Sequence, residues 1–232
     1  MNENLAVTSE TYSATELFVA GSAFPVVTDA VTVASGANLA RGAVLGKITI
    51  GAASVAAAGA GEAGANTGNG TLVMNATTPI LKGAKPGVYQ LNIVKAAVAS
   101  PAAAAVAHLF DPDGDLIGVI DVATNPGTAF AKQLKFTIKD GTTAFAAGDG
   151  FSITVAAGAG TYKIVDSASV DGSDVPCAVL ASSANATDGA VVAPVYLTGE
   201  FNAAAMVFGG SDTYATHKDE LRKLGIFVKT VA

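Results

Sequence analysis

Hydrophobic and polar positions alternate in short segments along most of the chain, which is the pattern of β-strands with one buried face. In residues 24–33, for example, Val27, Val31 and Val33 alternate with polar or small neighbours, and a second strand is expected over residues 41–50. Turn residues separate the segments at intervals of about 8–12 residues, as in small β-sandwiches and barrels. The further strands expected from this pattern lie at residues 71–75, 87–95, 104–110, 115–122, 133–139, 150–155, 162–165, 177–182, 191–197 and 226–231.

One stretch near the C-terminus departs from this alternation and predicts short helices instead. Asn202 is suited to cap a turn over residues 203–208, and Ser211 with Asp212 is suited to cap a helix after it. Gly225 follows this stretch and supplies the residue type that commonly ends a helix.

Two segments of mostly small residues interrupt the strand pattern. Residues 51–70 and 156–160 are rich in Gly and Ala, a composition typical of linkers. They bracket a segment that alternates and turns as a self-contained unit. The sequence therefore predicts an N-terminal arm at residues 1–20 and a discontinuous core at residues 21–55 and 157–232. A small β-sandwich or barrel is expected as an insertion at residues 65–156.

The composition supports a mainly β fold. Hydrophobic residues make up 50% of the 232 positions, but aromatic residues only 6%, and there are 26 glycines and no Trp. Charged residues account for 14%, against roughly 25% in typical soluble domains. A chain this poor in charge and rich in Gly and Val favours many short strands and turns over long helices.

The charge balance excludes two classes of partner. The formal net charge is −6, and the first forty residues carry four acidic residues without a Lys or Arg. Nucleic acids and anionic membrane surfaces both select clustered cations, so neither is an expected partner. Residues 1–20 also lack the cationic start and apolar run of a signal peptide, which predicts synthesis in a cytosol.

Two glycine motifs resemble nucleotide-binding sequences without the residues that such sites require. The pattern G-x-G-x-x-G spans Gly59 to Gly64, but no helix pattern follows it, so we interpret it as linker. Gly46 and Lys47 resemble the end of a phosphate loop, but Ile48 stands where that loop needs Ser or Thr. No cofactor is expected.

An acidic alternation marks residues Asp111, Asp113 and Asp115. A calcium-binding EF-hand would need Gly and Glu where this chain has Leu116 and Val122. The Pro-Asp-Gly order within the segment is typical of a hairpin turn, which is the favoured interpretation. A weak Ca²⁺ site on the turn stays open.

The chain offers few residues for catalysis. Cys177 is the one cysteine, so an internal disulfide and a multi-cysteine metal site are excluded, and its apolar surroundings predict a buried, inert thiol. His108 falls on an expected strand and His217 on the solvated face of the expected helix, neither beside a nucleophile motif. We therefore expect no catalytic residues, no metal ligands and no enzymatic activity.

The apolar residues near the N-terminus have no evident partner close by in the sequence. Leu17, Phe18, Val19 and Phe24 follow a polar, Ser/Thr-rich segment that has little else to bury. Extended arms of this kind add a strand to the edge of a sheet in another molecule. The arm is thus the expected site of protein–protein binding.

Several short motifs resemble the head decoration proteins of tailed phages, of the lambda D type. The sequence RGAVLGKIT at residues 41–49, preceded by VTVASG at 31–36, resembles the N-terminal core of that family. Residues 161–165 and 166–172 are similar to the next strand and turn of the family. Its central hairpin is similar to residues 177–180, 185–189 and 191–197, and its C-terminal end to the region that begins at residues 197–201. The resemblance covers residues 20–50 and 160–232, and longer members of the family resemble this chain in carrying an extra β domain between the same strands.

The resemblance implies a β-clip-like core that sits as homotrimers on the outer surface of the expanded capsid, made in the bacterial host cytoplasm. It also implies an arm that orders on the shell by strand addition to the major capsid protein, and a role in stabilising the head. Carried over by position, the capsid-facing segment is residues 12–27, with Tyr12, Leu17, Phe18, Val19, Phe24 and Val26 as contacts. Trimer contacts are expected at Met206, Phe208 and Tyr214, where short family members carry aromatic bulk before the helix.

A second function stays open, in which the inserted domain is an adhesin-like module that binds glycans or a host surface. Glycan-binding platforms usually present aromatic rings to solvent. The aromatic residues of the segment mostly occupy core-like alternating positions, so strong glycan binding is not expected; they are Tyr89, Phe110, Phe130, Phe136, Phe145 and Phe151.

Overall fold

The computed structural model describes residues 18–21, 23–57, 66–99 and 102–230. The chain divides into two units, each with its own hydrophobic core. Unit 1 comprises residues 1–47, 161–168 and 173–232, and unit 2 comprises residues 48–160 and 169–172.

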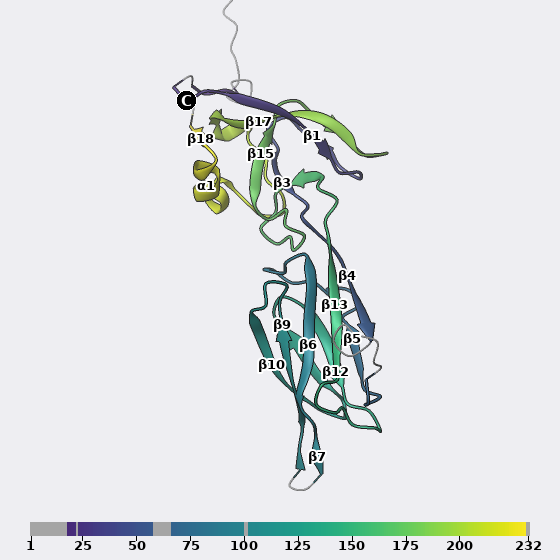
Figure 1. Ribbon diagram of the computed structural model, residues 1–232. Coiled ribbons are helices and arrows are strands. Elements are labelled where there is room, and N and C mark those ends of the chain that lie inside the picture. The colour runs from purple at the N-terminus through teal and green to yellow at the C-terminus, as the bar shows by residue number, and fades with distance from the viewer. Residues whose placement is uncertain (1–17, 22, 58–65, 100–101, 231–232) are drawn as a thin grey trace, which may run out of the picture. The chain divides into compact units, whose positions relative to one another are not determined.

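Unit 1 is built on a five-stranded barrel of mixed strand direction (Figure 1). In order around the barrel its strands are β1 (Val27–Val33), β14 (Tyr162–Ile164), β3 (Val44–Lys47), β15 (Pro176–Leu180) and β17 (Val191–Asn202). The antiparallel pairing of β17 with β1 closes the barrel, and the β1–β14 pair is the parallel one in this ring. A further strand, β18 (Ile226–Lys229), runs parallel to the end of β17, and β2 (Asn38–Leu39) pairs with β16 (Ala184–Asn185).

The central strands of unit 1 are buried on both faces, which explains their continuous apolar runs. On β3, Leu45 packs inside the barrel while Val44 packs in a second cluster that includes residues of the helix. On β15, Leu180 and Val179 divide in the same way. The second cluster consists of Phe18, Val44, Val165, Val179, Phe201, Met206, Leu221 and Ile226.

The turn and the helix predicted near the C-terminus are confirmed as a 3₁₀ turn, η1 (Ala203–Ala205), and one α-helix, α1 (Tyr214–Lys223). Asn202 caps η1 as predicted, whereas α1 begins later than predicted, with Thr213 as its N-cap. Gly225 follows the helix at φ +76°, a left-handed conformation that favours glycine. Within the described part of the chain, no helix has the length and apolar character needed to cross a membrane.

Unit 2 consists of two main antiparallel sheets that share one core (Figure 1). The larger sheet has the order β10 (Leu116–Val122), β9 (Ala105–Phe110), β6 (Gly87–Lys95), β13 (Gly150–Ala157) and β4 (Ile50–Ala57). The smaller has the order β11 (Thr128–Ala131), β12 (Lys135–Lys139) and β5 (Thr71–Met74). A short hairpin of β7 (Val98–Ala99) and β8 (Ala102–Ala103) projects from one end of the unit.

The segments predicted as linkers are partly strands. Residues 51–57 lie in β4 and residues 156–157 end β13, so the linker prediction is wrong for both. Backbone N–H and C=O groups form the ladder, and Gly and Ala supply these as well as larger residues do. Ala53 and Val55 pack partly against the core from this edge strand. Residues 58–65 lie outside the described residues.

Candidate functional site

The N-terminal segment is packed against the barrel, beginning at Phe18. The Phe18 side chain is 2% exposed, and its ring centroid lies 5.2 Å from that of Phe201 and 5.8 Å from that of Tyr196. The guanidinium of Arg41 covers the ring at 4.5 Å from the centroid. As expected, Phe18 has no partner close by in the sequence; its partners within the chain, Tyr196 and Phe201, lie far away in the sequence.

The backbone of this segment extends the sheet at the end of β17. The amide of Asn202 donates to the carbonyl of Phe18, and the amide of Ala20 donates to the carbonyl of Glu200, both at 2.9 Å. These two bonds flank an antiparallel bridge at Val19. Residues 18–20 thus pair with the end of β17 in the chain's own barrel.

Glu200 binds the part of the N-terminal segment that follows Ala20, through the backbone of Ala23. Its carboxylate pairs with Lys229 at 2.8 Å and accepts a hydrogen bond from the amide of Ala23 at 3.2 Å. The hydrogen bond from Lys229 holds the pKa of Glu200 below its ordinary value. A Cβ at Gly21 would lie 1.8 Å from the Glu200 Oε2 atom, so a larger residue here would require the Glu200 side chain to move.

A second aromatic contact lies where the segment joins β1. The Phe24 ring meets the Phe227 ring edge-on, with centroids 4.9 Å apart. The Thr198 hydroxyl donates to the carbonyl of Pro25 at 2.8 Å and accepts from the amide of Val27 at 3.1 Å. Phe24 therefore also has a partner within unit 1, one that is remote in the sequence.

The predicted arm residues fall into three groups. Phe18 and Phe24 are held by contacts within unit 1, so they are not free for another molecule in this conformation. Val19 and Val26 expose 41% of their surface each. Tyr12 and Leu17 lie outside the described residues.

The residues expected at trimer contacts lie beside the helix. Met206 is 9% exposed and fills the second cluster of unit 1, whereas Phe208 and Tyr214 are half-buried against it. Val207, between the first two, is 40% exposed. In this region the side chain of Met206 faces the core of its own chain and offers little surface to a neighbour.

His217 is buried, contrary to the prediction that it lies on a solvated helix face. It is 3% exposed, and its ring stacks on that of Phe208 with centroids 5.8 Å apart and planes inclined by 8°. Its Nε2 donates to Asp212 Oδ2 at 2.8 Å. Asp212 also accepts from the hydroxyl and the amide of Ser167, both at 2.6 Å.

These bonds explain why Thr213, and not Ser211 or Asp212 as predicted, caps the helix. They also show that Ser167, Asp212 and His217 do not form a catalytic triad. The hydrogen bond from the Ser167 hydroxyl is the main cause that lowers the pKa of Asp212 to about 2. The Asp212 carboxylate binds Ser167 and His217 and not the first amides of the helix, so Thr213 is the N-cap of α1. A nucleophilic triad needs the imidazole between Ser and Asp. Here Asp212 lies between Ser167 and His217, so the arrangement joins α1 to a loop and does not activate the serine.

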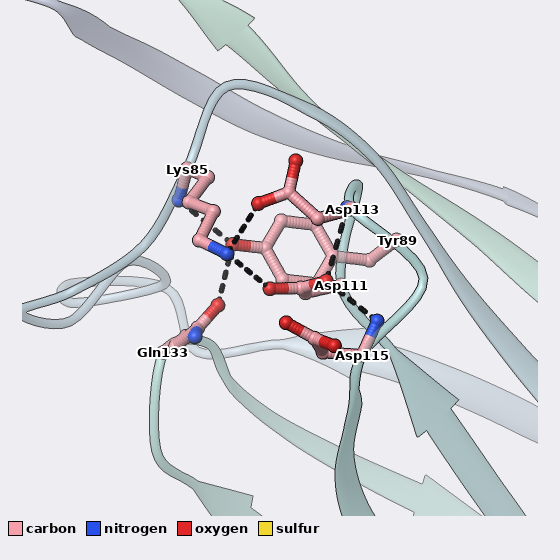
Figure 2. A network of polar contacts seen from close by, with 6 residues as sticks. All are labelled: Lys85, Tyr89, Asp111, Asp113, Asp115 and Gln133. Atoms are coloured by element: carbon pink, nitrogen blue, oxygen red, sulfur yellow. Dashed lines mark hydrogen bonds and ion pairs between the residues drawn. The ribbon is translucent and has the colours of Figure 1, made fainter.

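The acidic segment of unit 2 is a hairpin turn between β9 and β10, as predicted (Figure 2). Asp111 Oδ1 accepts from the amides of Asp113 and Asp115, each at 3.0 Å, and Gly114 has φ +88°. Lys85 Nζ lies 2.6 Å from Asp111 Oδ2 and 2.5 Å from Asp113 Oδ2. The hydrogen bond from Lys85 lowers the pKa of Asp111. An ammonium group therefore takes the position between these carboxylates that a Ca²⁺ ion would need.

The same network continues into the core of unit 2. The Tyr89 hydroxyl accepts from the amide of Lys85 and donates to Gln133 Oε1, both at 2.8 Å (Figure 2). Tyr89 is fully buried, and burial raises the pKa of its hydroxyl. The cluster is a set of satisfied structural contacts that ties three loops together.

Cys177 lies on β15 and is half-buried, whereas the sequence predicted a buried thiol. Its thiol donates to the carbonyl of Leu45 at 3.1 Å, and burial raises the pKa to about 11. Since the thiolate is the reactive form, this environment favours an inert thiol. Among the residues that the structure describes, no group of three or more His, Cys, Asp or Glu side chains is placed to hold a metal ion.

Comparison with known proteins identifies the family. No curated protein and no solved structure shows significant similarity to the chain. The family model of the bacteriophage lambda head decoration protein D matches residues 7–226, which include parts of both units. The chain therefore belongs to the family of bacteriophage lambda head decoration protein D, a structural and non-enzymatic family of phage capsid decoration proteins.

Proposed function

We propose that the protein binds the outer surface of the expanded phage capsid as trimers and stabilises the head. The observation that carries this proposal is the family match over residues 7–226, since membership implies a place on the virion capsid surface. Within this proposal unit 1 is the β-clip-like decoration core, and unit 2 is a domain inserted between its strands.

The capsid-binding element in this proposal is the segment before Phe18, with the major capsid protein as its partner. Phe18 and the two backbone bonds beside it anchor the chain to β17, so residues 18–20 serve as the root of the arm. Tyr12 and Leu17 remain proposed contacts with the capsid. The exposed side chains of Val19 and Val26 extend the apolar surface from this root.

The proposed trimer contacts lie beside α1. Phe208 and Tyr214 are half-buried and keep part of their rings available to a neighbouring copy. Val207 adds an exposed apolar side chain between Met206 and Phe208. Met206 supports this surface from beneath, as a residue of the core.

Decoration of isolated capsids tests the proposal. Expanded, undecorated capsids of the phage that encodes this protein are incubated with the purified chain and reconstructed by electron cryo-microscopy. We expect added trimeric density on the outer surface, together with disruption of the shell at a higher temperature than for undecorated capsids. Unchanged capsids, or density without threefold grouping, would contradict the proposal.

The glycan-binding alternative gains no support from the aromatic residues of unit 2. Tyr89, Phe130, Phe136, Phe145 and Phe151 are each no more than 8% exposed. Phe110 alone among the six is half-buried, so a flat stacking platform of several rings is not formed.

A further inference from the structure

Unit 2 contains an open pocket, lined by polar residues and glycines, that the decoration function does not use. It has a volume of about 450 Å³ and lies where β5 begins and β12 ends, beside the loop that follows β10. Ligand sites in proteins commonly have volumes of about 300–1,000 Å³. The pocket is lined by Asn69, Gly70, Thr71, Thr124, Asn125, Lys139, Asp140, Gly141 and Thr142.

The most informative residue in the pocket is Asp140, which is 4% exposed. Its Oδ1 atom accepts from the amides of Gly141 and Phe145 at 3.0 and 2.9 Å. Its Oδ2 atom has no hydrogen-bond partner among the described residues, yet no buried polar side-chain atom there is left unsatisfied. Oδ2 is therefore not fully enclosed, and Asp140 lines two adjoining hollows with its carboxylate held by the bonds to Oδ1.

Hydrogen bonds also fix the loop residues that line the pocket beside Asp140. Asn69 Oδ1 accepts from the amide of Thr143 at 2.9 Å, and Asn69 Nδ2 donates to the Thr142 hydroxyl at 3.0 Å. Gly141 permits the close approach of the two loops, because a Cβ there would lie 1.9 Å from Asn69 Oδ1. The pocket is thus formed before any ligand arrives, which reduces the entropy lost on binding.

The remaining polar groups of the pocket are exposed and available. Thr71, Thr124 and Asn125 make no side-chain hydrogen bond to another described residue, and Lys139 makes no ion pair with one. Together they offer hydroxyl and amide groups that both donate and accept, and one ammonium donor. The one carboxylate and the one ammonium balance in charge.

This chemistry selects a neutral, hydroxyl-rich ligand. A single carboxylate is a poor cage for a metal ion, since Ca²⁺ takes about 6–8 oxygen ligands. An anionic ligand would meet the charge of Asp140 at close range. Sugar hydroxyls both donate and accept, which matches the lining. We propose that this pocket of unit 2 binds a neutral sugar unit, with Asp140 as the central acceptor and Asn125, Thr71 and Lys139 around it.

A second hollow of about 340 Å³ adjoins the first and shares Thr124 and Asp140 with it. Its other lining residues are mostly apolar: Ala97, Val98, Ala103, Ala104, Val122 and Ala123. It offers space for a methyl or acetyl substituent. No aromatic ring lines either hollow, so a single site is expected to bind weakly, in the millimolar range. If the protein decorates the capsid as proposed above, many copies lie on one particle, and their weak binding sites together give a higher overall affinity.

Ligand-observed saturation-transfer NMR with the full chain tests the proposal, since it detects weak binding. The probes are glucose, galactose, mannose, rhamnose and N-acetylglucosamine, each added alone. We expect transfer to at least one of these sugars. In Asp140→Asn and Asn125→Ala we expect its affinity to fall by about fivefold or more, the effect of one lost hydrogen bond.

Matched substitutions outside the pocket control for charge and folding. Asp121→Asn removes an exposed carboxylate on β10, and Asn92→Ala removes an amide on β6; neither should change binding. Asn125 is exposed and makes no side-chain bond, so its variant keeps the test valid even if Asp140→Asn destabilises unit 2. The proposal is overturned if none of the sugars shows transfer, or if the pocket variants bind as the controls do. Capsids are absent from the measurement, so its failure would leave the decoration function untouched.

Discussion

The ring of Phe18 lies against the ring of Phe201, with centroids 5.2 Å apart and planes inclined by 42°. This contact joins the start of the described chain to the end of its longest strand. The N-terminal segment therefore belongs to the fold from Phe18 onward. In the proposed function, the arm therefore extends from this anchor, with Tyr12 and Leu17 before it as proposed capsid contacts.

Replacing Phe18 by Ala should destabilise unit 1. Removing a buried Phe side chain typically costs about 3–5 kcal/mol in the free energy of unfolding. Urea unfolding followed by fluorescence or circular dichroism measures this loss. Val19→Ala is the matched control, because Val19 is 41% exposed and its variant should stay within roughly 1 kcal/mol of the parent protein. Equal effects of the two substitutions would contradict the anchoring role.

Gly42 is expected to tolerate a side chain far less well than Gly36. Both have positive φ angles, +85° and +92°, at which an L-residue costs about 1–2 kcal/mol. A Cβ at Gly42 would also lie 2.0 Å from the carbonyl oxygen of Ala205, whereas a Cβ at Gly36 meets nothing within 4 Å. Gly42→Ala should therefore lower the melting temperature clearly more than Gly36→Ala. The same shift in both variants would show that the clash is absent.

The Asp212 carboxylate should make the stability of unit 1 depend on pH in the acidic range. Its pKa falls from an ordinary 3.8 to about 2 in the folded chain, so its stabilising bonds are present above pH 3.8 and are lost as the pH falls towards 2. Asp212→Asn should thus be less stable than the parent protein at neutral pH, and the gap should narrow in strong acid. Melting temperatures at several pH values measure the gap. Asp219→Asn, on the same helix but exposed, should show no comparable gap at neutral pH.

The Cys177 thiol should react slowly with iodoacetamide while the chain is folded. With a pKa of about 11, it carries little thiolate at pH 8. Mass spectrometry over time should show alkylation at least about tenfold slower than in the urea-unfolded chain, whose thiol has an ordinary pKa. Equal rates would mean that the thiol is neither shielded nor shifted.

The strands that alternate clearly were predictable from the sequence. The strand expected over residues 87–95 agrees with β6 in both bounds, because each second residue is buried there. The hairpin turn at Asp111 to Asp115 followed from turn chemistry alone. Residues 51–57 were missed because Gly and Ala carry no periodic signal, although their backbone pairs with β13.

The parts of the site that could not be predicted depend on contacts between distant residues. No partner for Phe18 could be found close by in the sequence, because its partners, Tyr196 and Phe201, are remote in sequence. His217 lies among charged helix residues, so the local pattern places it on the surface; Phe208 and Asp212 bury it instead. The burial of a polar residue can be predicted only when its hydrogen-bond partner is known.

Co-sedimentation tests whether the arm binds the capsid. Expanded, undecorated capsids are mixed with the full chain, or with a chain that begins at Phe18 and so keeps its anchor. The melting temperature of the shortened chain should match that of the full chain, which shows that its fold is intact. The account predicts saturable binding of the full chain and loss of binding when residues 1–17 are removed. Equal saturation by the shortened chain, or no binding by the full chain, would contradict it.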